Sequence, residues 1–267
     1  MNDRNVSILA ALTLWQREVV RFLRQRSRVV SALVSPIFFW AFFGLGLGTS
    51  FSPAGSTHKI SYLEFFFPGT LAMILLFASI FSTISIIEDR REGFLQSVLV
   101  SPAARWSIVL GKIMGGTTLA WLQGLVFLVL APLSGIHLTF AHTIGLAAII
   151  FIFGFGLTGV GFLIAWPMDS TQGFHAIMML FLMPMWMLSG SMFPATGAPR
   201  WLQFIMAINP VTYGVAAVRA MFYDNVAAVT GGSPPSLGFS LAVSVLFGIA
   251  TFVASIWLTN RPVRGTR

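Results

Sequence analysis

The sequence predicts an all-α polytopic membrane protein with six transmembrane helices. Hydrophobic residues make up 56% of the 267 residues and charged ones only 9%, and the mean hydropathy is +0.85. A soluble domain carries about 25% charged residues, because its surface must be wetted. The apolar runs are long and do not alternate as in a membrane barrel, and a helix satisfies its own backbone groups in lipid.

Six stretches are long and apolar enough to cross a hydrocarbon core, which takes about 20 such residues. They lie at 29–51, 65–87, 108–131, 141–166, 174–193 and 237–258. We therefore expect one membrane domain over 29–258, an N-terminal segment over 1–28 and a basic tail over 259–267. The chain has no cysteine, which excludes disulfides and thiolate metal ligands.

The basic residues gather at alternate ends of these spans. Of the 16 Lys and Arg, six precede Val29, four lie between Arg90 and Lys112, and three follow Leu258. Such clusters mark cytoplasmic segments. The pattern predicts an even number of spans with both termini in the cytoplasm. Although the net charge is +8, there is no soluble face for nucleic acid, so we expect no nucleic-acid partner.

The N-terminal segment has the spacing of an amphipathic helix. Its apolar stripe consists of Ile8, Leu12, Trp15, Val19 and Phe22. Its basic stripe consists of Arg17, Arg21, Arg24 and Arg28. We expect this helix to lie in the membrane interface, with its arginines toward anionic lipid headgroups. The alternative is a soluble helix packed on a partner protein.

The segment 195–224, between the fifth and sixth spans, is apolar but broken. Its two helical stretches, 200–208 and 211–223, are each too short to span, and Asn209-Pro210 separates them. Asn suits an N-cap and Pro suits the first helical turn. The pattern predicts a re-entrant hairpin in the outer leaflet, with a loop and one surface helix as the alternative.

The densest polar patch follows the second span. Glu88-Asp-Arg-Arg-Glu-Gly93 precedes a short run with helical apolar spacing that ends at Ser101-Pro102. A cytoplasmic helix with an apolar face and charged flanks favours docking of a partner protein over 88–105. The alternative is a solvated turn whose charges only fix topology.

Three motifs give the chain a family resemblance. The stretch from Glu88 to Pro102, with Arg105 and Gly111-Lys112 behind it, resembles the ABC-2 family of transporter permeases. Leu188-Ser-Gly-Ser-Met-Phe-Pro194 is similar to the Ser-Gly-x-x-Phe-Pro turn of that family, and Asn209-Pro-Val-Thr-Tyr213 with Arg219 to its Asn-Pro-x-x-Tyr…Arg element. The match is best with the branch of daunorubicin and nodulation-factor exporters. Phe94 and Gln96 depart from the family pattern.

The resemblance implies a half-size export permease, acting as a homodimer with two separate ATP-binding subunits. ATP and Mg would bind to those subunits and no cofactor to this chain, which would move a small amphipathic substrate through a bacterial cytoplasmic (inner) membrane. The coupling residues would be Glu88, Arg90, Arg91, Glu92, Gly93, Leu95, Leu99, Ser101 and Pro102. The re-entrant hairpin and outer gate would include Phe193, Pro194, Asn209, Pro210, Tyr213 and Arg219. Trp15, Arg17, Arg21 and Arg24 would belong to the interfacial helix, in contact with membrane lipid.

No feature of the sequence predicts an enzyme. A P-loop is absent, because Gly111-Lys112 is followed by Ile113 and lacks the preceding glycine. The four histidines are scattered, so we expect no catalytic residue and no metal site. We also expect the six spans to contain no ionisable side chain, which argues against a proton path through the membrane. An ion-coupled carrier and a membrane-embedded lipid-modifying enzyme remain as alternatives.

Overall fold

The computed structural model describes residues 3–47, 61–136, 138–193, 195, 198–223, 225–230, 232 and 234–261. This part of the chain is helical and contains no strand. The α-helices are α1 (Asp3–Arg24), α2 (Arg26–Leu47), α3 (Tyr62–Ser82), α4 (Ile84–Arg91), α5 (Phe94–Leu99), α6 (Arg105–Leu128), α7 (Phe140–Ala165), α8 (Thr171–Trp186), α9 (Arg200–Ile208), α10 (Pro210–Phe222), α11 (Val226–Thr230) and α12 (Leu237–Asn260). A 3₁₀ turn, η2 (Ala131–Ser134), follows α6, and a π-helical turn, η3 (Met187–Ser191), follows α8.

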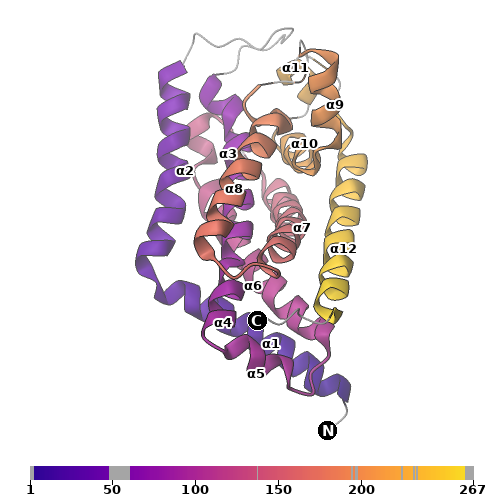
Figure 1. Cartoon of the computed structure of the whole chain (residues 1–267). Coiled ribbons are helices and arrows are strands. Elements are labelled where there is room, and N and C mark those ends of the chain that lie inside the picture. Colours follow the sequence, from indigo (N-terminus) through magenta and orange to yellow (C-terminus); the bar gives the residue numbers. More distant parts are fainter. Residues whose placement is uncertain are drawn as a thin grey trace.

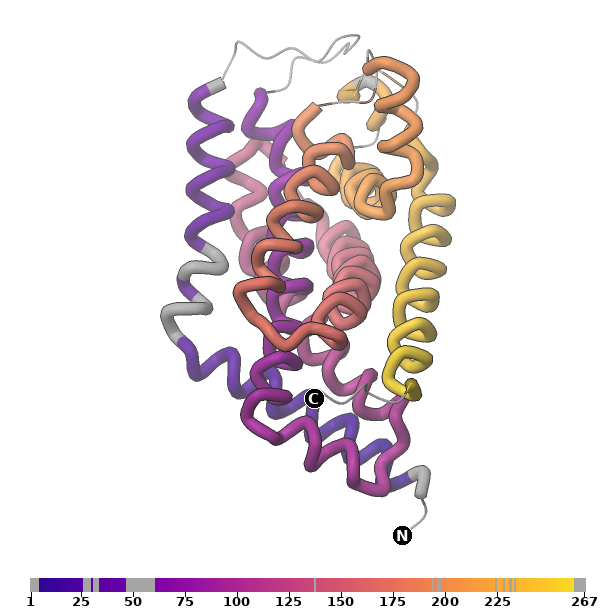
Figure 2. The backbone as a smooth tube through the Cα atoms, in the orientation of Figure 1, coloured from indigo at the N-terminus to yellow at the C-terminus, as the bar shows by residue number. Residues whose placement is uncertain are grey.

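The long helices form a bundle with different structures at its two ends (Figure 1). Helix α1 crosses one end beside α4 and α5, and α9, α10 and α11 gather at the other. Figure 2 shows the chain turning sharply between α1 and α2, so that α1 lies across the bundle and α2 runs along it. The described ends of the chain, at Asp3 and Arg261, lie at the α4–α5 end.

Four helices of the described chain are long and apolar enough to cross a membrane. They are Tyr62–Arg91, Phe140–Ala165, Thr171–Ser191 and Leu237–Asn260. The count rises to five if α9 and α10, bent by 83° at Asn209, are one span. Helix α6 is not among them, and its sequence contains the polar residues Lys112 and Gln123. The predicted span 29–51 extends beyond the described residues. Within the described part of this span, the apolar helix covers Val34–Gly46. The sixfold count therefore stays a prediction.

Helix α3 lies at the centre of the bundle, where it packs against α2, α6, α7, α8 and α10. Its Pro68 has no N–H and would leave the carbonyl of Glu64 without a helical donor. The Tyr223 hydroxyl donates to that carbonyl at 3.0 Å, so the proline is tolerated. One turn later, the Trp186 indole N–H donates to the carbonyl of Gly69 at 2.8 Å. These two bonds join α8 and the end of α10 to the central helix.

Glycines allow α6 to approach its neighbours closely. A Cβ atom on Gly116 would lie 2.7 Å from Thr158 Cγ2 of α7 and would also overlap Ser82 of α3. We expect Gly116→Leu to lower the free energy of unfolding by at least about 1–3 kcal/mol, the usual cost of overpacking. Gly46→Leu is the matched control, because a Cβ there meets nothing within 4 Å. Thermal unfolding in detergent measures the difference, and equal unfolding temperatures for the two variants would contradict this packing.

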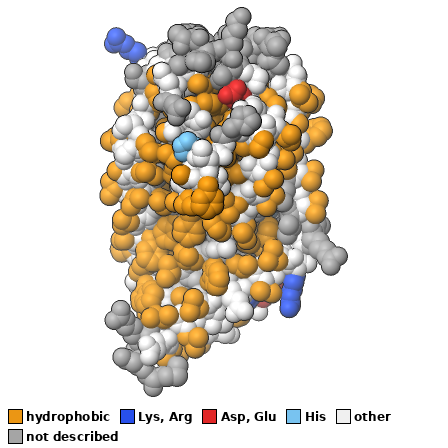
Figure 3. Space-filling view, turned by 180° about the vertical axis from the view of Figure 1, so that it is seen from behind, with side chains coloured by type: hydrophobic (Ala, Val, Ile, Leu, Met, Phe, Trp, Pro, Cys, Tyr) orange, Lys and Arg blue, Asp and Glu red, His pale blue; other side chains and the backbone are white. Residues whose placement is uncertain are grey.

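The outer surface of the bundle is apolar. Large hydrophobic side chains of α12 point outward at helical spacing: Phe239, Leu246, Ile249, Val253 and Trp257. The face seen in Figure 3 is apolar over most of its height, and the few charged side chains visible on it lie near its ends. Such a surface suits a lipid environment, because a monomeric soluble protein rarely exposes so large an apolar patch.

Candidate functional site

The predicted coupling segment forms a helix–turn–helix at one end of the bundle. Helix α4 continues α3 after a bend at Thr83, and α5 starts at Phe94. Between them Gly93 has a φ of 77°, a left-handed conformation that favours glycine and turns the chain sharply. The side chain of Leu95 anchors α5, since it is 3% exposed. The segment is thus a fixed structure rather than an open loop.

Helix α1 packs along α6 at very short range. Cβ atoms added to Gly111 and Gly115 would lie 2.7 Å from the carbonyl oxygen of Ala11 and 2.6 Å from Cβ of Glu18. The Trp15 indole N–H donates to Thr118 Oγ1 of α6 at 3.0 Å. The buried face of α1 consists of Ser7, Ala11, Leu14 and Glu18. This face lies between the two stripes seen in the sequence, so α1 is attached to the bundle.

Five charged side chains from α1, α4 and α6 meet in a cluster, which we call the charged cluster: Arg17, Glu18, Arg21, Asp89 and Lys112. The Arg17 guanidinium binds the Asp89 carboxylate with two hydrogen bonds, of 2.7 and 2.9 Å. Arg21 Nη1 donates to Asp89 Oδ1 at 2.9 Å. Lys112 Nζ contacts Glu18 Oε1 at 2.5 Å and also pairs with Asp89 Oδ2. The Asp89 side chain is 0% exposed, so it is the central acceptor of the cluster.

Two expectations about charge are wrong. Lys112 lies inside the predicted span 108–131, and its side chain is 3% exposed, so that span does contain an ionisable group. Arg17 and Arg21 face the carboxylates of α4 rather than lipid headgroups. Both errors have one cause: burial of a basic side chain is costly unless an acid pairs with it, and the pairing acids Asp89 and Glu18 lie far from Lys112 in the sequence.

The cluster stabilises the charged form of Arg17. Burial lowers the pKa of its guanidinium, but the hydrogen bond and charge of Asp89, with the charges of Glu18 and Glu92, outweigh burial and raise that pKa. The guanidinium carbon also lies 3.8 Å from the ring centroid of Phe94, the first residue of α5. A cation over an aromatic face is attracted by it. Arg17 therefore links α1 to both α4 and α5.

Further contacts fix the segment between α4 and α6. Arg90 donates to the carbonyl oxygens of Trp166 and Met168 and pairs with Asp169 at 3.1 Å, which attaches α4 to the loop between α7 and α8. The Ala104 N–H donates to Ser7 Oγ of α1 at 3.2 Å.

The other predicted coupling residues lie around this framework. Glu88 pairs with Arg21 at 2.9 Å, and the mostly exposed Glu92 is 3.4 Å from the same arginine. Leu99 is half-buried. The exposed members are Arg91, Gly93, Ser101 and Pro102, together with Arg24 of α1. The segment therefore has exposed residues along one edge, and its remaining residues are buried or ion-paired.

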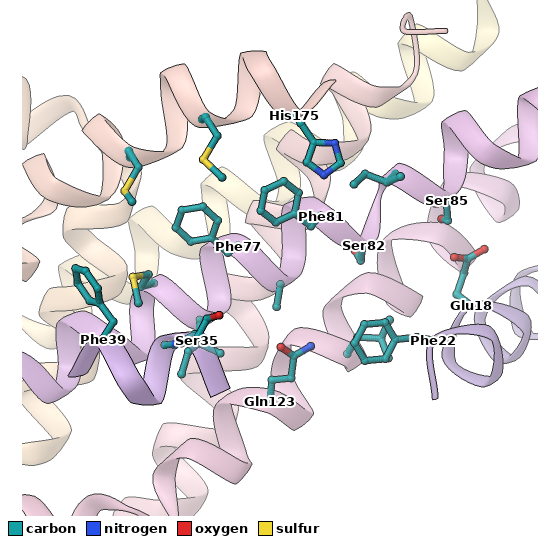
Figure 4. Close-up of a pocket in the computed structure, with 18 of the residues that line it drawn as sticks. Glu18, Phe22, Ser35, Phe39, Phe77, Phe81, Ser82, Ser85, Gln123 and His175 are labelled. Carbon is teal, nitrogen blue, oxygen red and sulfur yellow. The ribbon is translucent and has the colours of Figure 1, made fainter. Parts of the chain in front are cut away.

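A cavity of about 500 Å³ opens beside the charged cluster, between α1, α2, α3, α6 and α8. Figure 4 shows Phe39, Phe77 and Phe81 in its wall, with Gln123 and His175 among the polar groups. The His175 Nδ1–H donates to the carbonyl of Thr171 at 2.7 Å. The wall also includes Glu18 and Arg21 of the charged cluster, and Met179 and Met183 of α8. The cavity thus combines an apolar body with a polar, charged end.

The predicted outer-gate residues lie at the opposite end, except Pro194, which is outside the described residues. Asn209 caps α10, because its Oδ1 accepts from the Val211 N–H at 3.0 Å, and its amide donates to the carbonyl of Met185 at 2.5 Å. Pro210 is the first residue of α10. The Tyr213 hydroxyl donates to the carbonyl of Ala207 at 2.6 Å. Phe193 is partly exposed, whereas Arg219 is buried.

No sequence motif singled out Glu18, and Asp89 and Lys112 were predicted only as members of longer motifs. A signal was available for Glu18: it shares helical spacing with Ala11 and Leu14, which places it on a buried face. A buried acid and a lysine within an apolar helix each require an opposite charge. Among the described residues, no group of three or more His, Cys, Asp or Glu could hold a metal ion.

The family model of the ABC-2 type transporter matches residues 10–223. The chain is 26% identical over 250 residues to ycf38 of Cyanophora paradoxa, named as a transport permease, covering 89% of this chain and 84% of that one. It is 23% identical over 255 residues to nodulation protein J of Sinorhizobium fredii, covering 94% and 92%. It is 30% identical over 157 residues to YbhR of Escherichia coli, named as a multidrug ABC transporter permease, covering 58% and 42%.

The helical bundle and its apolar surface define a multi-pass membrane protein. Because the family model covers most of its length, the chain belongs to the ABC-2 type transporter family. It is a membrane permease of an ABC transporter, as the resemblance of its motifs to the ABC-2 family predicted.

Proposed function

We propose that this chain is the transmembrane subunit of an ABC exporter that moves a hydrophobic or amphipathic solute out of the cytoplasm. Hydrolysis of ATP, bound with Mg on a separate ATP-binding subunit, supplies the energy. The observation that carries this proposal is the rigid attachment of the exposed α4–α5 edge to α1 and α6 through the charged cluster. A push on α5 reaches both helices, because Arg17, Asp89 and Lys112 join them by ion pairs.

The edge of α5 has the composition of a docking surface. Gln96, Ser97 and Val100 are exposed, while Leu95 and the half-buried Val98 hold α5 in place. Residues 88–105 form the coupling region, and an ATP-binding subunit docks there. Two copies of that subunit act with a homodimer of this chain, as the family resemblance implies.

The proposed topology has six spans with both termini in the cytoplasm of a bacterial inner membrane. Helices α2, α3–α4, α6, α7, α8–η3 and α12 cross the membrane, and α9–α10 form the re-entrant hairpin. Supporting this, the α4–α5 segment and both described ends of the chain lie at one end of the bundle (Figure 1). The basic bias of those segments favours the cytoplasmic side. Helix α1 lies in the interface, with Ile8, Leu9 and Leu12 exposed toward lipid.

The cavity beside the cluster supports an amphipathic cargo. Its aromatic and methionine side chains suit an apolar body of varied shape, since methionine adapts to different surfaces. The polar groups at its wall suit a head group, and the cavity of about 500 Å³ is large enough for a small organic molecule.

Reconstitution in proteoliposomes tests the function. We expect ATP-dependent transport of a fluorescent amphiphile when the permease and its ATP-binding subunit, recovered by pull-down after mild extraction, are both present. Transport should stop without that subunit or with a non-hydrolysable ATP analogue. Transport that persists without it and requires a proton gradient would instead support the ion-coupled carrier. Chemical conversion of a lipid by the permease alone would support the lipid-modifying enzyme.

A further inference from the structure

Arg219 is a buried cation at the end of the molecule opposite the charged cluster. It lies in the apolar helix α10, and it is 5% exposed. Its guanidinium carbon lies 4.7 Å from the ring centroid of Phe65 in α3. An aromatic face partly stabilises a desolvated cation. That stabilisation is smaller than the cost of burying an ion without a counter-charge.

The guanidinium lacks a counter-charge within the described chain. Its Nε and Nη2 are buried and have no hydrogen-bond partner there. The ion pairs of the described residues do not include Arg219. The side chain cannot escape this cost by losing its proton, because arginine remains protonated in proteins. An acceptor carrying negative charge is the group that would satisfy both nitrogens.

A second, separate cavity of about 130 Å³ lies beside this side chain. Its wall includes Ser189, Gly190 and Thr212. The hydroxyls already donate elsewhere: Ser189 to the carbonyl of Trp186 and Thr212 to that of Met206, both at 2.6 Å. Arg219 also lines this cavity, so its guanidinium is the charged donor group that a ligand there would meet.

We propose that this second cavity is an anion site in which Arg219 binds an oxyanion group, a phosphate, sulfate or carboxylate. The planar guanidinium offers two parallel N–H donors, which match the two oxygens of such a group. The volume is several times the roughly 30 Å³ of one water molecule, so it accepts a small charged group. The group can come from a lipid headgroup, from the cargo or from free anion. The site does not depend on coupling to ATP.

Thermal unfolding of the purified permease tests the site, with sodium chloride replaced by sodium sulfate or phosphate at constant ionic strength. A ligand that binds only the folded state stabilises it in proportion to occupancy. We expect a saturable rise of about 2–4 °C in the unfolding temperature of the wild type. The rise should disappear in Arg219→Gln and persist in Arg200→Gln, the matched control at the exposed start of α9. Both variants lose one arginine from the same end of the bundle.

A second variant keeps the test decisive if Arg219→Gln does not fold. Arg219→Lys retains the charge without the planar fork, so the anion-dependent rise should fall by at least half. Native mass spectrometry separates the sources: fewer retained phospholipids in Arg219→Lys than in the wild type identify a headgroup, and unchanged retention identifies a free anion or cargo. A wild type without a saturable rise overturns the proposal. So does a rise that Arg219→Gln retains, because the anion would then bind elsewhere on the protein.

Discussion

Asp89→Asn is expected to prevent the permease from accumulating in a folded form. Asp89 is the central acceptor of the charged cluster and is fully buried. Removing one member of a buried ion pair costs about 3–5 kcal/mol, because the remaining charge stays buried without compensation. A domain has only about 5–15 kcal/mol of total stability. The loss is therefore a large part of what keeps the protein folded.

The penalty should fall chiefly on Lys112. The side chains of Arg17 and Arg21 are 29% and 24% exposed, so they can turn toward water, whereas that of Lys112 is 3% exposed. The double variant Asp89→Asn/Lys112→Gln also removes the lysine charge, which the single variant leaves buried without Asp89. It should recover part of the lost stability, which a double-mutant cycle reports as coupling.

Fluorescence-detected size-exclusion chromatography and thermal unfolding in detergent measure both effects. Glu92→Gln is the matched control, because Glu92 belongs to the same segment, contacts Arg21 at 3.4 Å and is 58% exposed. An exposed ion pair contributes about 0–1 kcal/mol, so this variant should unfold near the wild-type temperature. Equal losses of unfolding temperature in Asp89→Asn and Glu92→Gln would contradict the role of Asp89 as the central acceptor of the charged cluster.

Local sequence signals predicted the elements that depend on neighbouring residues. Asn209-Pro210 indicated the break between α9 and α10, and the structure places the Asn cap and an 83° bend there. The spacing from Ile8 to Phe22 indicated a helix, and α1 runs over Asp3–Arg24. Caps, prolines and helical periodicity act within a few residues, so the sequence alone carries them.

The charged cluster could not be predicted in the same way. Its pairs join residues far apart: Lys112 is 94 residues from Glu18, and Asp89 is 72 from Arg17. The sequence identified a basic stripe on α1 and an acidic patch after α3 without a reason to pair them. Lipid headgroups and carboxylates are both anionic, and only the packing of α1 on α6 determines which of them the arginines of α1 face. The Tyr223 hydroxyl that satisfies the carbonyl opposite Pro68 is a further long-range contact of this kind.

Val100→Asp is expected to uncouple the permease from its ATP-binding subunit while leaving it folded. Val100 follows α5 and is 85% exposed, so a carboxylate there meets water and the fold should be unaffected. In the proposed complex the same side chain is covered by the partner. Burying an unpaired carboxylate in that contact would cost at least about 2 kcal/mol, which is roughly a thirtyfold loss of affinity.

Biolayer interferometry with the purified ATP-binding subunit measures that affinity, and transport in proteoliposomes measures its consequence. Gln16→Asp is the control, because it introduces the same charge at an exposed position of α1, at the same end of the bundle but outside the α5 edge. The control should bind and transport like the wild type. If Val100→Asp keeps wild-type affinity and transport, the partner does not cover the end of α5. If both variants weaken binding equally, the contact is a general charge effect, and residues 88–105 are not the coupling region.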